Sequence, residues 1–248
     1  EKNRFRVNRQ YQGMMDEEEE RLSMKQQFIW LNDVLDYLPV QTMIYDGIEA
    51  DDTIAYLTKH TESDLGNEVV IVSTDKDFLQ LVSDKVKVFS PTKKKLYDRQ
   101  MVYDEFGIWP ENLLLYRTLD GDKSDNIPGI RGCGIKTLLK RFPELSEDRT
   151  ITHEEFFQMC EEKHGKIKLY DDILKAKDQL LMNKRLMELD QPHIPTNQKL
   201  KILDRFNETD IEFKKLDFLR VGQKYKILQN WRDINDWLHS TFHNIITK

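Results

Sequence analysis

EVVIVSTDKD, at residues 68–77, is the clearest buried strand in the chain and the strongest indication of its architecture. A short run of β-branched residues that ends in polar residues is typical of a strand inside a sheet. A strand-like run precedes it at 41–45 and a helix at 50–59, while a short helix at 76–82 and a strand at 85–89 follow. Strands that alternate with helices predict an α/β fold, with a mainly parallel sheet flanked by helices.

Outside this layer the pattern is helical. Apolar residues recur at helical spacing from about 16 to 38, where Pro39 ends the pattern. Further helices are expected at 110–119, 135–142, 154–163 and 167–182, and within 198–206 and 231–246. The second half of the chain is therefore interpreted as a helical region packed on the α/β half. The three lysines at 93–95 are expected to lie in a solvated hairpin turn, and a contact with DNA is the alternative.

Composition excludes several classes of protein. The 248 residues are 39% hydrophobic and include 12 Phe, 9 Tyr and 4 Trp, which is ample for a folded core. No apolar stretch reaches the roughly 18–20 residues that span a bilayer, so no membrane segment is predicted. The two cysteines, Cys133 and Cys160, can form neither a disulfide framework nor a Cys-rich zinc site. The sequence thus predicts a reducing, cytoplasmic setting.

The net charge of −6 conceals a separation of charge along the chain. Residues 46–77 carry nine acids against two lysines, whereas residues 123–141 carry five bases against one acid. An acidic block beside a basic one suits a metal-dependent enzyme that acts on a polyanion. Two solvated faces are the alternative that charge alone leaves open.

Three clusters of acids lie at expected strand ends or helix starts, and they are the candidate metal ligands: Glu49, Asp51 and Asp52; Asp75 and Asp77; Asp122 and Asp125. One acid at a helix start is often only an N-cap. Crowded carboxylates, however, repel one another unless a cation neutralises them, and Mg²⁺ or Mn²⁺ prefers oxygen ligands. Two such ions can activate water for phosphodiester hydrolysis without a Ser, Cys or His nucleophile. His60, His153 and His164 are predicted to be surface residues.

The third cluster leads into IPGIRGCGIKT at residues 127–137. This is no phosphate-binding P-loop, because Ile135 separates Gly134 from Lys136 and no strand precedes it. Glycines between two helices let backbone N–H groups approach a phosphate, which suits a grip on a nucleic-acid backbone. An ordinary corner between two helices is the alternative. The candidate DNA-binding residues are Gly129, Gly132, Gly134, Lys136, Thr137, Lys140 and Arg141.

Four motifs resemble the 5′ nuclease family: EADD at 49–52, STDKDFLQL at 73–81, GDKSDNIPG at 121–129 and GCGIKT at 132–137. That family includes flap endonucleases, the 5′-exonuclease domains of bacterial DNA polymerase I and bacteriophage-type ribonuclease H. The resemblance covers about residues 1–142, and the Ile194-Pro195 turn and long helical tail are most similar to the phage branch.

The resemblance implies a PIN-like core with a helix-hairpin-helix and metal-dependent cleavage near 5′ ends or flap junctions. Two Mg²⁺ or Mn²⁺ ions are implied, with K⁺ at the hairpin. The implied substrate is DNA with a 5′ end, a flap or an RNA primer, and a replication protein is a further implied partner. If the protein is viral, its compartment is the host cytoplasm. Lys2, Arg4 and Arg6 are implied as catalytic residues near the scissile phosphate, and Arg9 as a contact to the 5′ strand.

Four segments follow from the same resemblance. Residues 1–38 correspond to a remnant of the helical arch with the helix after it, and residues 39–120 to the PIN-like metal-binding core. Residues 121–190 correspond to the helix-hairpin-helix DNA-binding region, and residues 191–248 to a C-terminal helical tail packed on the core.

The family pattern begins with a strand and two acids that have no counterpart before Lys2. The expectation is that this part is truncated or supplied by another chain, which leaves Val70 and Ile71 short of a neighbour and the protein prone to associate. The alternative function is therefore a non-catalytic fragment that binds DNA junctions. A nucleotide-binding α/β protein is a weaker third hypothesis.

Overall fold

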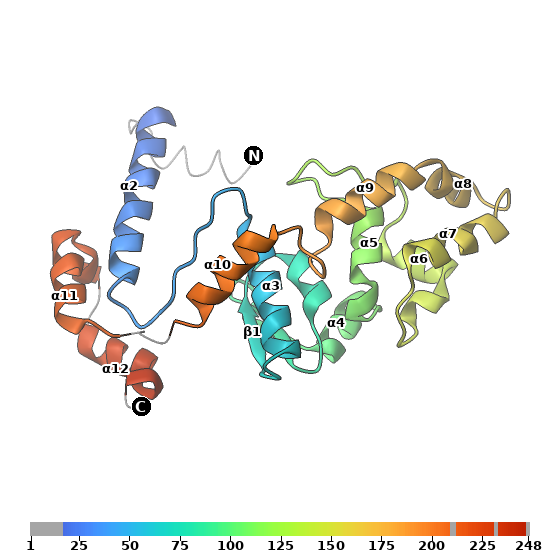
Figure 1. Cartoon of the computed structure of the whole chain (residues 1–248). Coiled ribbons are helices and arrows are strands. Elements are labelled where there is room, and N and C mark those ends of the chain that lie inside the picture. The colour runs from blue at the N-terminus through green and yellow to red at the C-terminus, as the bar shows by residue number, and fades with distance from the viewer. Residues whose placement is uncertain (1–16, 209–211, 231–232, 247–248) are drawn as a thin grey trace. The chain divides into compact units, whose positions relative to one another are not determined.

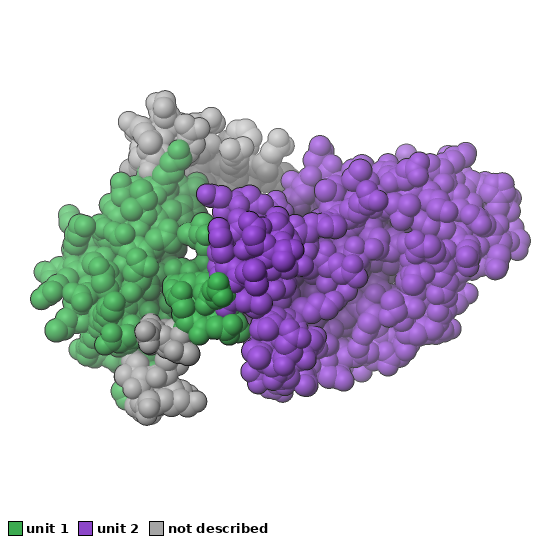
Figure 2. All heavy atoms as spheres, in the orientation of Figure 1, with its two compact units in different colours: residues 1–44, 204–248 green, residues 45–203 purple. Residues whose placement is uncertain are grey.

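The computed structural model describes residues 17–208, 212–230 and 233–246. The chain divides into two compact units (Figure 2), of which unit 1 combines residues 1–44 with 204–248 and unit 2 comprises residues 45–203. Unit 1 thus draws on both ends of the chain, and unit 2 on its middle. Within the described ranges, no helix combines the length and apolar character needed to cross a membrane.

Unit 2 contains a three-stranded sheet in the order β1 (Val69–Val72), β2 (Val86–Ser90) and β3 (Lys95–Tyr97). β1 runs parallel to β2, with Ile71 opposite Val88, and β3 runs antiparallel to β2. The strands expected at 68–73 and 85–89 are thereby confirmed, as is the turn near 93–95 that joins β2 to β3. The sequence did not predict β3, which gives the described sheet one parallel and one antiparallel pair.

The two faces of the sheet differ in burial. Ile71, Val86 and Val88 are buried in the main hydrophobic cluster, because alternate residues of a strand point to the same side. On the opposite face Val70 and Val72 are 57% and 65% exposed. In the described part of the chain no strand pairs with the outer edge of β1. The expectation that Val70 lacks a neighbour agrees with this exposure, whereas the same expectation for Ile71 is wrong.

Helices make up most of the rest of unit 2 (Figure 1). They are α3 (Ala50–Ser63), η1 (Lys76–Leu81), α4 (Arg99–Phe106), η2 (Pro110–Asn112), α5 (Leu113–Asp120), α6 (Ile135–Arg141), η3 (Pro143–Ser146), α7 (His153–Glu162), α8 (Lys168–Lys175) and α9 (Lys177–Met187). The helix expected at 167–182 is interrupted at Ala176 and forms two helices. The Ala176 N–H donates to the carbonyls of both Asp172 and Ile173. α9 lies beside α5, and the Asn183 side chain donates to the Thr118 carbonyl at 3.0 Å.

Unit 1 contains α2 (Glu17–Leu35), α11 (Lys215–Lys224), η4 (Ile227–Asn230) and α12 (Ile234–Ile246), while α10 (Thr196–Phe206) spans the division between the units. Val34 of α2 packs in one apolar cluster with Phe218, Leu238 and Phe242. α2 ends close to where Pro39 was predicted to stop the helix.

The strand expected at 41–45 is wrong. These residues have no ladder partner among the described strands, and Ile44 is 77% exposed. The Gln41 side-chain amide instead donates to the carbonyls of Arg205 and Glu208, at 3.0 and 2.8 Å. The Gln41 side chain thus ties this segment to the end of α10 and the residues after it, and not to a neighbouring strand.

His153 is also not a surface residue. It begins α7 and is 6% exposed, with its Nε2 atom 3.2 Å from the Thr118 hydroxyl. Burial lowers the pKa of His153 to about 4, so its ring is neutral near pH 7. This histidine therefore belongs to the contacts that hold α7 against α5.

Candidate functional site

A cavity of about 840 Å³ in unit 2 brings together five of the seven predicted metal ligands: Glu49, Asp51, Asp75, Asp77 and Asp125. They come from three segments, namely the start of α3, the start of η1 after β1, and the loop after α5. Acids are favourable in the first turn of a helix because the backbone N–H groups there carry partial positive charge. This preference accounts for the acids at the starts of α3 and η1, whereas Asp125 reaches the same cavity from a loop.

The other two predicted ligands lie in different environments. Asp52 is on α3 but does not line the cavity; burial, followed by the nearby Asp51 and Glu49, raises its pKa. Asp122 is connected to the cavity through Arg117, which also pairs with Asp77. Of the seven predicted ligands, five thus line the cavity, Asp77 both lines it and pairs with Arg117, Asp122 pairs with Arg117 alone, and Asp52 does neither.

Arg117 lies between two of the predicted ligands. Its Nε donates to Asp77 Oδ1 at 2.6 Å, and its Nη2 donates to Asp122 Oδ2 at 2.5 Å. The side chains of all three residues are less than 20% exposed, so water screens these ion pairs only weakly. The two carboxylates hold the pKa of Arg117 above its usual value. The sequence reasoning did not single out Arg117, although a base one helical turn before Gly121-Asp122 was a visible signal.

The carboxylates around Arg117 differ in their proton affinity. The pKa of Asp122 is lowered to about 2, first by hydrogen bonds from the Ser124 side chain and then by Arg117. The pKa of Asp77 is instead raised, because its burial outweighs the opposing effect of Arg117. Asp75 Oδ1 accepts the Asp77 backbone N–H at 2.8 Å, which fixes the first turn of η1.

The donor set fits a hard divalent cation, because the cavity offers carboxylate oxygens and neither thiol nor imidazole lines it. Even so, nowhere in the described residues do three Asp, Glu, His or Cys side chains converge as a ready-made metal site. Arg117 already engages one oxygen of Asp77 and one of Asp122.

The glycine hairpin joins α5 to α6 and is anchored by its backbone. The Pro128 carbonyl accepts from the side chains of Gln179 and Asn183 of α9, at 2.9 and 2.8 Å. A Cβ atom on Gly129 would lie 1.9 Å from the Asp120 carbonyl oxygen, so this glycine is needed for close backbone packing. The structure thus gives Gly129 a packing role, in addition to the phosphate contact predicted for it.

The rest of the hairpin faces solvent. Gly132 and Gly134 have no atom within 4 Å of a Cβ position, and Lys136, Thr137 and Lys140 are exposed. Arg141 is half-buried, while Leu138 and Cys133 are fully buried and hold α6 in place. No carboxylate of the described chain forms an ion pair with Lys136 or Lys140, so both ammonium groups are available to an anionic ligand.

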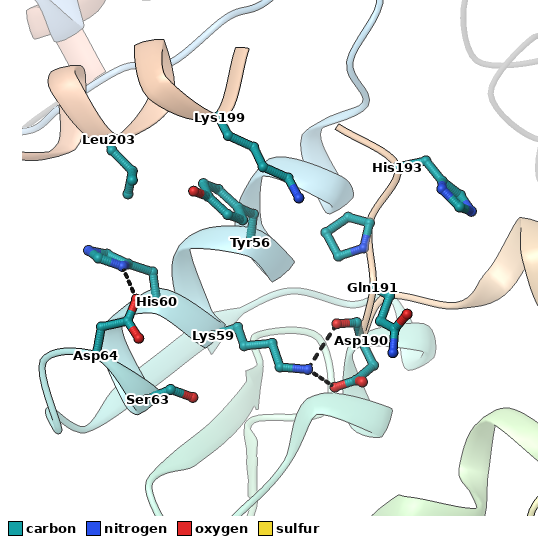
Figure 3. Close-up of a pocket in the computed structure, with 11 residues that line it drawn as sticks. Tyr56, Lys59, His60, Ser63, Asp64, Asp190, Gln191, His193, Lys199 and Leu203 are labelled. Atoms are coloured by element: carbon teal, nitrogen blue, oxygen red, sulfur yellow. Dashed lines mark hydrogen bonds and ion pairs between the residues drawn. The ribbon is translucent and has the colours of Figure 1, made fainter. Parts of the chain in front are cut away.

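A second pocket of about 660 Å³ lies between the C-terminal half of α3 and residues 190–203 (Figure 3). Its charges are largely paired with one another. Lys59 binds Asp190 at 2.5 Å, and His60 binds Asp64 at 2.6 Å (Figure 3). Two lysines (Lys59 and Lys199) and two aspartates (Asp64 and Asp190) line this pocket, so it lacks the excess of one charge that distinguishes the acidic cavity.

Four predicted site residues cannot be placed. Lys2, Arg4, Arg6 and Arg9 lie outside the described residues, so their predicted contacts with the scissile phosphate and the 5′ strand stay predictions.

In sequence the chain is similar to 5′-3′ exonucleases and DNA polymerases I. Residues 1–107 match the model of the 5′-3′ exonuclease N-terminal resolvase-like domain. A 5′-3′ exonuclease of Aquifex aeolicus is 35% identical over 162 residues, which are 60% of this chain and 55% of that protein. DNA polymerase I of Bacillus subtilis is 35% identical over 185 residues, which are 72% of this chain and 20% of that protein. The chain thus spans about half, or less, of the length of these relatives.

The fold has a solved counterpart in a flap endonuclease of bacteriophage T5, crystallised as a pseudo-enzyme-product complex with DNA and metal ions. The TM-score is 0.57 at 23% identity, and the match covers 88% of this chain and 76% of that one. This likeness confirms the PIN-like α/β fold predicted from the sequence.

Proposed function

We propose that this chain is a member of the 5′ nuclease family and acts as a divalent-metal-dependent, structure-specific 5′ nuclease; its similarity to 5′-3′ exonucleases and its fold support this. It would hydrolyse phosphodiesters near 5′ ends or flap junctions, as a 5′-3′ exonuclease or flap endonuclease. The observation that supports this most is that the acidic cavity and the basic hairpin are adjacent along the chain. Asp125 and Ile127 line the cavity, and the hairpin follows directly. A backbone phosphate near the hairpin is thereby brought toward the carboxylates.

Glu49, Asp51, Asp75, Asp77 and Asp125 would hold the metal, which we propose to be Mg²⁺ or Mn²⁺, with two ions bound. Ions bound there would activate water and neutralise charge on the phosphate that is attacked. The T5 flap endonuclease contains metal ions, which supports a metal requirement here. Asp52 and Asp122, which do not line the cavity, would add negative charge beside the bound ions. Binding of K⁺ at the hairpin stays a prediction.

The exposed surface of the hairpin would bind duplex DNA through its backbone. Lys136, Lys140 and Arg141 supply the charge, Gly132 and Gly134 leave room for a phosphate to approach, and Thr137 is exposed next to Lys136. Contacts of this kind position DNA without reading its sequence. We therefore propose that residues 121–190 form the DNA-binding region and residues 39–120 the metal-binding core, with residues 1–38 and 191–248 as the flanking segments named above.

Replacing Lys136 with glutamine should weaken binding of duplex DNA about equally for different sequences, because a phosphate contact carries no base information. The slope of log affinity against log salt should decrease by about one unit. Fluorescence anisotropy on two unrelated duplexes at several salt concentrations measures both effects. Lys94→Gln, an equally exposed lysine in the β2–β3 turn, is the matched control and should leave affinity unchanged. A loss confined to one duplex would indicate base readout instead.

A non-catalytic DNA-junction-binding fragment is the second candidate, favoured by the finding that no three ligands converge in the described region. A cleavage assay separates the two functions. The purified chain should cut a labelled 5′-flap duplex in Mg²⁺ or Mn²⁺ and should be inactive in EDTA. Binding of the same duplex without any cut product in either metal would favour the binding fragment.

The biological setting is a further part of the proposal. Similarity to a DNA polymerase I supports removal of RNA primers or flaps during replication, alongside other replication proteins. A reducing cytoplasm, of a host cell if the protein is viral, would keep the buried Cys133 and Cys160 as free thiols.

A further inference from the structure

We propose that Arg117 is a built-in cation that holds Asp77 and Asp122 together in the metal-free protein and competes with a metal ion for them. It is a positioning residue for the metal site. The inference rests on the proposed function, because it concerns how the proposed metal would enter its site.

The first support is geometric. Asp77 belongs to the start of η1 and Asp122 to the loop after α5, and a single guanidinium joins them at 2.6 and 2.5 Å. Arg117 also donates to the Gly121 carbonyl at 3.4 Å, and the α5 residues Leu115 and Leu119 are buried. The arginine is therefore anchored by its helix and does not reach the acids from a free surface position.

The second support is electrostatic. The side chains of Asp77 and Asp122 are 18% and 19% exposed, and both charges face one arginine that is itself 13% exposed. If the guanidinium is removed, two poorly hydrated carboxylates lose the cation that they share, and they repel each other. A cation of some kind is thus required at this point, and in the metal-free chain the side chain of Arg117 provides it.

The third support is a contrast among the acids. In the part of the chain that the structure describes, no lysine or arginine forms an ion pair with Glu49, Asp51, Asp75 or Asp125, although these acids line the same cavity. A first ion can therefore bind the open acids directly. An ion that uses Asp77 or Asp122 must first replace the hydrogen bonds of Arg117, so we infer that the second ion binds more weakly and later.

A neutral polar replacement tests this inference in the full 248-residue chain. Arg117→Gln should melt at a lower temperature than the wild type in EDTA, because the shared cation is lost. Mn²⁺ should restore most of that loss, since the ion replaces the guanidinium. The affinity for Mn²⁺, measured from the free-ion signal in electron paramagnetic resonance, should rise about tenfold, the scale on which groups next to metal ligands act.

The matched control is Arg99→Gln. Arg99 also joins carboxylates, those of Glu111 and Asp148 and, at 3.9 Å, that of Asp84, but none of these residues lines the acidic cavity. This variant should lose stability without any change in its response to Mn²⁺. If Arg117→Gln gains no more stability or affinity from Mn²⁺ than the wild type and Arg99→Gln do, Arg117 is an ordinary structural ion pair and the inference is overturned.

A second variant covers the case in which Arg117→Gln does not fold. Arg117→Lys keeps the charge but cannot donate to both acids in the fork geometry of a guanidinium. Its affinity for Mn²⁺ should exceed that of the wild type, and an affinity at or below that of the wild type would contradict competition. None of these readouts needs turnover, so failure of the flap-cleavage assay would count against the proposed function alone.

Discussion

Replacing Asp75 with asparagine should reduce metal-dependent cleavage of a 5′-flap duplex by at least about 100-fold, because even partners behind a metal ligand are worth about 10–100-fold. Asp75 lines the acidic cavity and its Oδ1 accepts the Asp77 N–H at 2.8 Å. Asparagine retains an oxygen that can accept this bond, so the substitution removes the charge and keeps the turn. The rise in melting temperature caused by Mg²⁺ should also become smaller.

The control for this substitution is Asp98→Asn. Asp98 caps α4 in the same way, by accepting the Met101 N–H at 2.8 Å, but it does not line the cavity. It should keep wild-type cleavage and a wild-type response to Mg²⁺. DNA binding by Asp75→Asn should be nearly unchanged in an anisotropy assay. Full cleavage by Asp75→Asn would remove this carboxylate from the proposed site.

Gly129→Ala should be the most destabilising single substitution in the hairpin, by about 3 kcal/mol or more. The added Cβ would stand 1.9 Å from the Asp120 carbonyl oxygen, which belongs to the backbone and cannot rotate away. The hairpin would have to move outward, and the bond from the Ile130 N–H to the Leu119 carbonyl, now 2.7 Å, would be lost. Thermal unfolding should show a decrease in melting temperature of roughly 6–12 °C.

Gly134→Ala is the matched comparison in the same hairpin. Gly134 has a φ of −62° and no atom within 4 Å of a Cβ position, so alanine fits without strain. Because Gly134 is the N-cap of α6, its replacement with alanine should lower the free energy of unfolding by at most about 1 kcal/mol. Equal melting temperatures for the two alanine variants would show that the hairpin can move at little cost.

The sequence predicted those elements whose pattern is local. Residues 69–72 are a run of β-branched residues, and the first turn of α3 carries the acids Asp51 and Asp52. Both elements were therefore predicted from the sequence. Residues 41–45 have strand-like composition too, but a strand needs a partner, and that depends on parts of the chain far away in sequence. β3 was missed for the opposite reason, because three residues that begin with a lysine carry almost no periodic signal.

The site was predictable to a similar extent. Acids that follow successive structural elements are visible in the sequence, and five of them do line one cavity. The role of Arg117 was not visible, because a single arginine on a helix looks like a solvated residue until Asp77, 40 positions earlier, is seen to contact it. Gly129 likewise looked like a point of phosphate approach, and only the structure shows the Asp120 carbonyl packed against it.

Unit 1 combines two segments that are far apart in the sequence, which affects how it can fold during synthesis on the ribosome. Val34 packs with Phe218, Leu238 and Phe242, so the partners of α2 are synthesised long after α2 itself. At about 5–20 residues per second, the delay between Val34 and Phe218 is roughly 10–40 seconds. During this time unit 2 can emerge and fold, whereas the apolar side of α2 waits without its partners. Nascent chains of this protein should therefore engage chaperones through α2, and release them only as α11 and α12 appear.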